Sequence, residues 1–428
     1  MSKASCPAVL ISAPASGQGK TLATAALARA WKNRGLRVRA FKCGPDFLDP
    51  MILQKATGQP VYNLDLGMCG EKDGLKQLHA AAQEADVIIV EGVMGLYDGN
   101  PSSADIAAQF KLPVLIAIDA GGMAQTFGAL AAGLLAWKPE LKPAGVLANK
   151  VGSPGHAKLL RDSLPPHLNW FGALQRDAEF ALPERHLGLF RADEIDDLEA
   201  RIEAAARALA DSGELPLPPA VSFELAPEEP QPPLLAGKTI AIARDAAFCF
   251  IYPANLDCLR EMGANITFFS PLHDRTLPDA DAYWLPGGYP ELHLEALTRN
   301  TAMREALRHA FQQQKPMLAE CGGMMALAES IGEQPAFGLL PGKCRMHDRL
   351  QGLGVMQMDL QAGKLGAHVF HYGSFETGLA PIATMPSRFG KPEHVYRHGS
   401  IQASFLHFYF ASNPAAVASL FLSSEHSS

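Results

Sequence analysis

The residue best suited to covalent chemistry in this sequence is Cys321. It lies in the segment KPMLAECGGMMALAES, which predicts a strand, a tight turn and a helix. A cysteine at such a strained corner, near a helix N-terminus expected to lower its pKa, is suited to nucleophilic catalysis. The backbone N–H of Gly322 is expected to be one oxyanion-hole donor, and the LPGGYPE segment offers a second at Gly287 or Gly288.

A cysteine nucleophile requires a general base, and the candidate is His407. This residue follows an alternating apolar run in the segment HGSIQASFLHFYF. The chain has 14 histidines, and a single histidine is more often structural than catalytic. The choice of His407 therefore depends on a family resemblance and not on position alone.

A phosphate-binding loop is predicted near the N-terminus, between an apolar run and a helical pattern. It consists of Ser16, Gly17, Gln18, Gly19, Lys20 and Thr21, the GK[ST] end of a P-loop. Glycines let backbone N–H groups approach phosphate oxygens, Lys20 can reach the β/γ-phosphates and the Thr21 hydroxyl can bind Mg²⁺. The opening glycine of the pattern is replaced by Pro14. The alternative is a glycine-rich turn that binds no nucleotide.

Acidic residues follow two later strands of the same half. Asp46 and Asp49 lie in KCGPDFLDP, and Glu91 and Asp98 lie in VEGVMGLYDG. Carboxylates beside a P-loop can complete a Mg²⁺ site, for which Asp46 and Glu91 are the first choices. Asn149, at the end of another strand, is a candidate adenine contact. Each of these residues could instead cap a turn or a strand.

The elements that must position these residues form two α/β halves. Short apolar runs predict strands over residues 8–13, 37–42, 86–91, 113–119 and 144–150, with a helix from Lys20 to a stop at Gly35. The second half predicts strands over 239–244, 266–270, 282–288 and 316–321. Continuous apolar strands alternating with helices indicate parallel sheets covered on both faces, with ligands at the carboxyl ends of the strands.

A Pro- and Glu-rich stretch from Gly213 to Lys238 separates the halves and predicts extended, poorly packed chain. The expected organisation is a P-loop NTPase-type domain over residues 1–215, a linker over 216–236 and a flavodoxin-like domain over 237–428.

Composition excludes several other classes of protein. The 428 residues are 48% hydrophobic and 19% charged, which is typical of ordered globular chains. A net charge of −7 gives no support to a nucleic-acid partner. Seven cysteines without a CxxC pair argue against a disulfide framework or zinc site. No apolar run is long enough for a membrane span or a signal peptide, so a cytoplasmic protein is expected. The oligomeric state stays open, with a homodimer among the alternatives.

Seven motifs together resemble the family of cobyrinic acid a,c-diamide synthases, which includes the hydrogenobyrinic acid enzymes of the aerobic cobalamin pathway. In the family's order, they are APASGQGKT, FKCGPDFLDP, VEGVMGLYDG, LPERHLGL (182–189), LPGGYPE, AECGG and SFLHFYF. FKCGPDFLDP is the most specific, since it separates this group from the similar cobyric acid synthases. The match covers nearly the whole chain.

The resemblance implies two joined reactions. The first half is similar to dethiobiotin synthetase and MinD-type ATPases, and would use ATP and Mg²⁺ to convert a corrin acetate into an acyl phosphate. The second half is similar to class I glutamine amidotransferases, with Cys321 as nucleophile and His407 as base releasing ammonia from glutamine. Asp46, Glu91 and Thr21 then belong to the metal end, and Asp49 and Asp98 to carboxylate activation. The two carboxylates amidated would be the a and c acetates.

Two departures from the family pattern affect this interpretation. Tyr409 stands where ordinary class I amidotransferases have a Glu two residues after the histidine, so a Cys–His dyad is expected. Ala367 and Val369 replace a Gly and a Glu in a GHEFHYS-like stretch. No residue of the sequence indicates whether the substrate carries cobalt, although the P-loop segment APASGQGKT favours the cobalt-free type.

Three other functions fit parts of the sequence. Cobyric acid synthase would amidate other side chains of the same ring. A MinD/ParA-like switch with an inactive amidotransferase domain is disfavoured by the intact Cys321 turn. Dethiobiotin synthetase needs no glutamine and no second domain.

Overall fold

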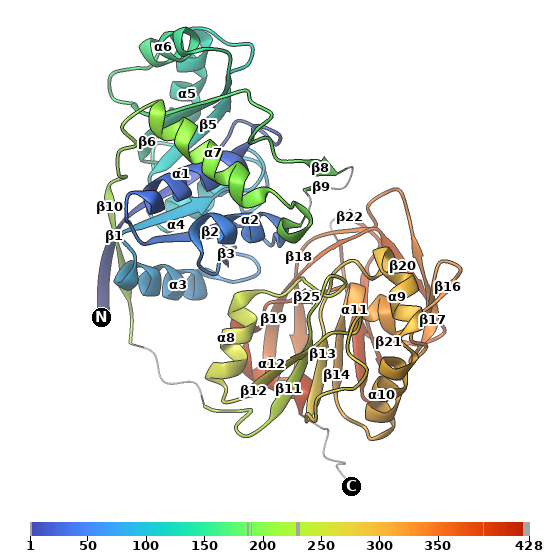
Figure 1. Ribbon diagram of the computed structural model, residues 1–428. Coiled ribbons are helices and arrows are strands. Elements are labelled where there is room, and N and C mark those ends of the chain that lie inside the picture. Colours follow the sequence, from blue (N-terminus) through green and yellow to red (C-terminus); the bar gives the residue numbers. More distant parts are fainter. Residues whose placement is uncertain (1, 186–187, 190, 228–231, 388, 423–428) are drawn as a thin grey trace. The chain divides into compact units, whose positions relative to one another are not determined.

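In the computed structural model, the chain forms two compact units, Met1–Glu228 and Glu229–Ser428. Each unit has a central, mostly parallel sheet with helices packed against it, as expected from the sequence (Figure 1). The structure describes residues 2–185, 188–189, 191–227, 232–387 and 389–422. Residues 186 and 187 of the LPERHLGL motif are outside the described part.

The first unit is built on a sheet with the strand order β3-β2-β4-β1-β5-β6-β7. These strands are parallel, as their continuous apolar runs predict. Their bounds are β1 (Ser2–Ser12), β2 (Val38–Cys43), β3 (Tyr62–Leu64), β4 (Val87–Glu91), β5 (Val114–Asp119), β6 (Pro143–Val151) and β7 (Asn169–Gln175). A short hairpin of β8 (Glu184–Arg185) and β9 (Gly188–Leu189) lies outside this sheet.

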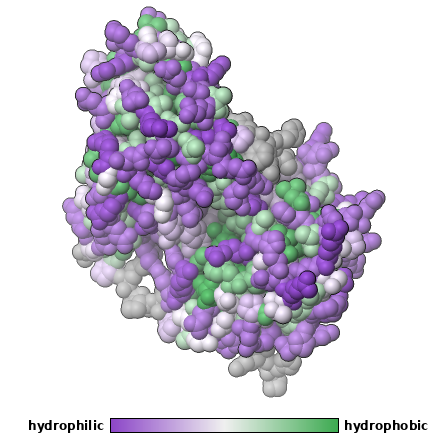
Figure 2. Space-filling model, viewed as in Figure 1, coloured by the Kyte–Doolittle hydropathy of each residue, from purple (hydrophilic) through white to green (hydrophobic). Residues whose placement is uncertain are grey.

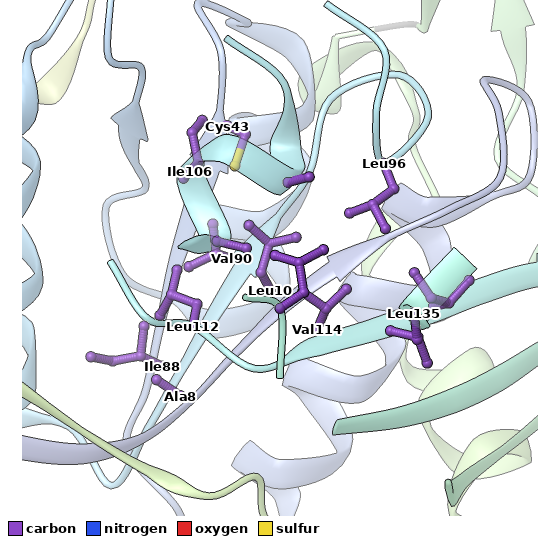
Figure 3. Packing of buried hydrophobic residues seen from close by; sticks show 14 of the residues in the cluster. Ala8, Leu10, Cys43, Ile88, Val90, Leu96, Ile106, Leu112, Val114 and Leu135 are labelled. Carbon is purple, nitrogen blue, oxygen red and sulfur yellow. The ribbon is translucent and has the colours of Figure 1, made fainter. Parts of the chain in front are cut away.

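Helices cover both faces of this sheet and complete two apolar layers. The helices are α1 (Lys20–Asn33), α2 (Leu48–Thr57), α3 (Glu71–Glu84), α4 (Ser103–Gln109), α5 (Thr126–Ala136), α6 (Pro154–Asp162) and α7 (Leu198–Asp211), with a 3-10 turn η1 (Ala192–Glu194). Alternate residues along the strands point into the two layers. Leu10, Val90 and Val114 pack in one cluster with Ile106 of α4 on one face (Figure 3). Val9 and Ile89 pack with Trp31 and Ile202 on the other.

The segment expected to be a linker contains a strand. Residues Ala220–Leu225 form β10, which pairs antiparallel with β1 from Ser2↔Leu225 to Pro7↔Ala220. Within VSFEL, Val221 and Phe223 are buried between exposed neighbours, which is the alternation of a half-buried strand. The surrounding prolines obscured this period in the sequence.

The second unit has the sheet order β12-β11-β13-β14-β24-β23-β21. Its first five strands are parallel, and β23 and β21 extend the sheet in antiparallel fashion. The bounds are β11 (Thr239–Ala243), β12 (Asn265–Phe269), β13 (Ala282–Leu285), β14 (Met317–Glu320), β21 (Pro381–Met385), β23 (Glu393–His398) and β24 (Ile401–Ser404). The four strands predicted for this half correspond to β11 to β14.

Two four-stranded sheets, which the sequence did not predict, complete the second unit. One is β16-β15-β17-β20, with β15 (Ala328–Ile331), β16 (Gln334–Pro335), β17 (Leu340–Met346) and β20 (Gly373–Glu376). The other is β22-β18-β19-β25, with β18 (Gly352–Leu360), β19 (Gly363–His371), β22 (Phe389–Gly390) and β25 (His407–Phe408). The helices are α8 (Pro253–Glu261), α9 (Leu294–Arg299), α10 (Thr301–Gln312), α11 (Gly322–Leu327) and α12 (Pro414–Phe421), with turns η2 (Pro290–Leu292) and η3 (Phe410–Ser412).

Hydrophilic side chains cover most of the visible surface of each unit (Figure 2). None of the helices in the described part of the chain has the length and apolar character required to cross a bilayer. The seven cysteines all lie within described residues and are free thiols.

Candidate active site

Cys321 occupies the sharp turn that the sequence predicts between a strand and a helix. It follows β14, precedes α11 and has φ 46° and ψ −108°, a strained conformation for a residue with a side chain. Its backbone N–H donates to the Ser404 carbonyl at 2.7 Å, at the end of the neighbouring strand β24. The sheet therefore determines the position of the thiol through its backbone.

The glycines around Cys321 are required by close packing. A Cβ on Gly322 would lie 2.9 Å from the Gly288 carbonyl oxygen and 3.0 Å from the Gly288 nitrogen. A Cβ on Gly323 would lie 2.0 Å from the Leu285 carbonyl oxygen. The two expected oxyanion-hole residues, Gly322 and Gly288, are thus adjacent. The Gly287 carbonyl accepts hydrogen bonds from the backbone of Cys249 and Phe250, each at 3.0 Å, which anchors this loop.

Glu320, which the sequence interpretation did not single out, connects the segments of the candidate nucleophile and the candidate base. Its Oε1 accepts the Phe408 backbone N–H at 3.0 Å and its Oε2 accepts Trp284 Nε1–H at 3.0 Å. Glu320 directly precedes Cys321 and Phe408 directly follows His407, so one buried carboxyl group holds both chain segments. Burial raises the pKa of Glu320 to about 8.

His407 is buried among other rings. In the ladder between β19 and β25 it stands opposite His368, and the two imidazoles stack with centroids 4.9 Å apart at 21°. The Phe250 ring lies 6.0 Å away. A Cβ on Gly287 would lie 2.2 Å from His407 Cε1, so the LPGGYPE loop contacts the edge of this imidazole. Tyr409, at the position of the usual triad Glu, is buried and packs edge-on against Tyr252 at 5.6 Å.

The charge state of the dyad differs from the sequence expectation. The pKa of the Cys321 thiol is raised, first by burial and then by Glu291, and not lowered by the helix N-terminus. The pKa of His407 lies well below its usual value because of burial and the neighbouring His368 and His371. Burial of the thiol outweighs the opposite effect of the Gly322 backbone N–H at the start of α11. The resting pair is therefore a neutral thiol and a neutral imidazole.

The phosphate-binding loop is held by two side-chain contacts. Asn149 Nδ2–H donates to the Gln18 carbonyl at 2.9 Å, and Gln18 Oε1 accepts the Asp119 N–H at 2.9 Å. A Cβ on Gly19 would lie 2.2 Å from Asn149 Nδ2, and Gly19 has φ 79°. Ser16 and Gly17 lie in the turn before α1, and Gly17 has φ 75°. Asn149 thus contacts the loop backbone, and the adenine contact expected from the sequence stays a prediction.

A polar cluster lies at the start of α1, where the sequence placed metal ligands. Thr21 Oγ1–H donates to Glu91 Oε1 at 2.8 Å and contacts Asp49 Oδ1 at 3.2 Å. Lys42 Nζ, which sequence reasoning missed, lies 2.7 Å from Asp49 Oδ2 and 3.1 Å from Glu91 Oε1. Burial alone would lower the pKa of Lys42, but Asp49 and Glu91 raise it above its usual value. Lys42 is therefore a buried cation at the end of β2.

Two of the predicted acidic residues make turn contacts. Asp46 Oδ1 accepts backbone N–H groups of Leu48 at 2.7 Å and Asp49 at 3.2 Å, which caps the first turn of α2. Burial raises its pKa to about 7, and the Asp49 charge adds to the effect. Asp98 Oδ2 accepts the Gly95 N–H at 2.9 Å. Asp49 and Glu91, and not Asp46, are thus the carboxylates beside Thr21.

The oxygen atoms of this cluster fit a hard divalent cation. Glu91 Oε2 is buried and has no hydrogen-bond partner among the described atoms. Mg²⁺ binds through a hydroxyl, one or two carboxylates, waters and phosphate oxygens rather than through an all-protein cage. The described part of the chain holds no cluster of three His, Cys, Asp or Glu residues suited to a metal. Thr21, Glu91 and Asp49 are the residues that would hold Mg²⁺ at this position.

Comparison with known proteins assigns a family domain to each of the two units. Residues 9–190 match the CobQ/CobB/MinD/ParA nucleotide binding domain, and residues 239–415 match the CobB/CobQ-like glutamine amidotransferase domain. The chain is 55% identical over 98% of its length to a hydrogenobyrinate a,c-diamide synthase of Stutzerimonas stutzeri (strain A1501), of which 99% is covered. It is 53% identical to one of Pseudomonas aeruginosa, with 98% of each chain covered.

A cobyrinate a,c-diamide synthase of Herminiimonas arsenicoxydans is 47% identical, with 96% of each chain covered. The relatives are thus matched over nearly their full length, and both halves of the chain contribute. Together with the P-loop unit and the cysteine-containing unit, these similarities show that the chain belongs to the family of hydrogenobyrinate and cobyrinate a,c-diamide synthases, ligases with a glutamine amidotransferase domain.

Proposed function

We propose that this protein uses ATP and glutamine to amidate the a and c acetate carboxylates of cobyrinic or hydrogenobyrinic acid. The observation that carries the proposal is the intact Cys321 turn, which Glu320 ties to the His407 segment, in a chain that also contains the Thr21, Asp49 and Glu91 cluster. An inactive amidotransferase domain would not need to retain the strained backbone of Cys321.

The second unit releases ammonia from glutamine. Cys321 Sγ attacks the side-chain amide carbon while His407 accepts the thiol proton, and the N–H groups of Gly322 and Gly288 bind the developing oxyanion. The C–N bond then breaks as His407 returns the proton to the departing nitrogen, giving NH₃ and a thioester. Water hydrolyses the thioester to glutamate and restores the thiol. Because burial raises the pKa of Cys321 and lowers that of His407, the thiol becomes a nucleophile only as His407 takes its proton.

The first unit activates the carboxylate. The substrate carboxylate attacks the γ-phosphorus of ATP, ADP leaves, and the resulting acyl phosphate loses phosphate when NH₃ attacks its carbon. Lys20 and the N–H groups of residues 16–21 would hold the phosphates. Thr21, Glu91 and Asp49 would hold Mg²⁺, which neutralises charge on the transferred phosphoryl group.

Further residues around the cluster support this site through their own contacts. Asn149 and Gln18 fix the shape of the phosphate-binding loop. Asp46 holds the start of α2 and hence Asp49. Lys42 keeps Asp49 ionised, since its charge lowers the pKa of that carboxyl against the effect of burial. Asp98 shapes the loop after β4.

Variants in each unit test whether the second unit releases ammonia and the first unit activates the carboxylate. Cys321→Ala should abolish glutamine-dependent synthesis and retain synthesis with ammonium chloride, whereas Lys20→Ala should abolish both. Cys249→Ala, which alters the less buried thiol of the same unit, is the matched control. Glutamine-dependent turnover by Cys321→Ala would refute the role of Cys321 as nucleophile.

Assays with cobyrinic and hydrogenobyrinic acid side by side identify the substrate, and amidation of other ring side chains would indicate the cobyric acid synthase reaction. Sedimentation analysis tests for a homodimer.

A further inference from the structure

A second buried histidine lies beside the base of the glutaminase site. His368 lies on β19 directly opposite His407 in the antiparallel ladder with β25. The two imidazoles stack at 4.9 Å with planes 21° apart, and both side chains are buried. Because cross-strand neighbours share one face of a sheet, the register itself brings the two rings together.

Tyr252 fixes the orientation of His368. The Tyr252 hydroxyl and His368 Nδ1 form a buried hydrogen bond of 2.9 Å. Tyr252 directly precedes α8, and Asn255 in the first turn of that helix bonds the backbone on both sides of Tyr409: Nδ2–H donates to the Phe408 carbonyl, and Oδ1 accepts the Phe410 N–H, each at 2.8 Å. The start of α8 thus holds both the His368 ring and the chain that carries His407.

The charges around this ring pair favour neutral imidazoles. Burial lowers the pKa of His368 to about 3, so this ring carries no charge at physiological pH. The other titratable groups near the pair or the thiol are His371, which bonds Glu393 at 3.0 Å, together with Glu320 and Glu291. Because the stacked His368 ring is neutral, it can fix the plane of His407 without the negative charge that would stabilise the protonated form of His407.

We propose that His368, oriented by Tyr252, is the positioning residue for His407 and supplies by ring stacking the orientation that a carboxylate supplies in ordinary class I amidotransferases. This inference rests on the proposed glutaminase role of His407. A hydrophobic side chain could fill the same volume, but only a ring bonded to Tyr252 has its plane fixed. His368 never contacts glutamine in this scheme and acts only through the base.

The test is glutamine hydrolysis by His368→Ala and Tyr252→Phe in the full chain. His368→Ala should lower kcat about 10- to 100-fold, a part of the roughly 10²- to 10⁴-fold that a positioned general base supplies. The KM for glutamine should stay within about twofold, because no glutamine contact is lost. Tyr252→Phe removes one oxygen and should lower kcat less, by about three- to tenfold. Ammonium-dependent synthesis should not change in either variant. His394→Ala, which alters a histidine on β23 bonded to Thr384, is the matched control.

The pH dependence separates positioning from simple packing. Removing His368 exposes one face of His407 to water and relieves part of the burial that depresses its pKa, so the acid limb of kcat/KM should move to higher pH. A lower kcat with unchanged pH profiles would overturn the proposal, since packing loss alone would cause it. If His368→Ala does not fold, the test rests on Tyr252→Phe. An unchanged kcat for glutamine hydrolysis by Tyr252→Phe would then overturn the proposal. Full hydrolysis by His407→Ala would instead refute the proposed base.

Discussion

Lys42 provides the sharpest test of the synthetase site. Its side chain is 3% exposed and is paired with Asp49, 13% exposed, and Glu91, fully buried. Lys42→Met would leave two buried carboxylates without their cation, and breaking a buried pair in this way costs about 3–5 kcal/mol. We expect the free energy of unfolding of the first unit to fall by about that amount at pH 8. The loss should shrink toward pH 5, because carboxyls whose folded-state pKa is raised are protonated below it and stop repelling each other.

Urea denaturation followed by circular dichroism measures this effect, with Lys55→Met as control. Lys55 lies exposed in the last turn of α2, so its replacement should change stability by no more than about 0.5 kcal/mol. The double variant Lys42→Met, Asp49→Asn should recover part of the loss, since it removes one of the stranded charges. Glutamine hydrolysis should persist while synthesis is lost. A destabilisation below about 1 kcal/mol, or one that grows as pH falls, would refute the buried cation.

Three further predictions concern the second unit. Gly287→Ala should lower glutamine hydrolysis at least about tenfold in steady-state assays but leave ammonium-dependent synthesis intact, because a Cβ would lie 2.2 Å from the His407 ring. Trp284→Phe removes the indole donor to buried Glu320 and should cost about 1–3 kcal/mol in chemical denaturation; unchanged stability would contradict that bond. Stability should also fall as pH drops below 6.5 toward the folded-state pKa of His368, about 3, because only the unfolded chain binds the proton there. His368 contributes about 1.4 kcal/mol per pH unit to this slope, and His368→Gln should reduce the slope by that amount.

Local patterns predicted the framework that carries both sites. The run 86–91 became β4 with Glu91 at its carboxyl end, and the strand-turn-helix pattern around Cys321 became the observed elbow. These features depend on a few consecutive residues, whose apolar continuity and glycines are visible in the sequence. The family motifs added His407, which no local pattern could distinguish from other histidines.

The missed residues depend on contacts between distant segments. Lys42 resembles a solvated strand end until β4 brings Glu91 to it, and His368 gains its role only through the register of β19 with β25. Asn149 follows its strand as expected, but the direction of its amide is set by the Gln18 carbonyl. The pKa of Cys321 rises because burial and carboxylates from other elements act on it. Such tertiary effects leave no periodic signal in the chain.

The pairing of β10 with β1 limits how early the first unit can complete its folding during synthesis. Strand β1 leaves the ribosome before its partner β10, which begins at Ala220, has been synthesised. At about 5–20 residues per second, residues 2–7 of β1 wait roughly 10–45 s without the strand they pair with in the fold. An unpaired edge is a template for association with other chains. Nascent chains stalled before residue 220 should therefore bind ribosome-associated chaperones more strongly than chains stalled after residue 260, when β10 has left the exit tunnel.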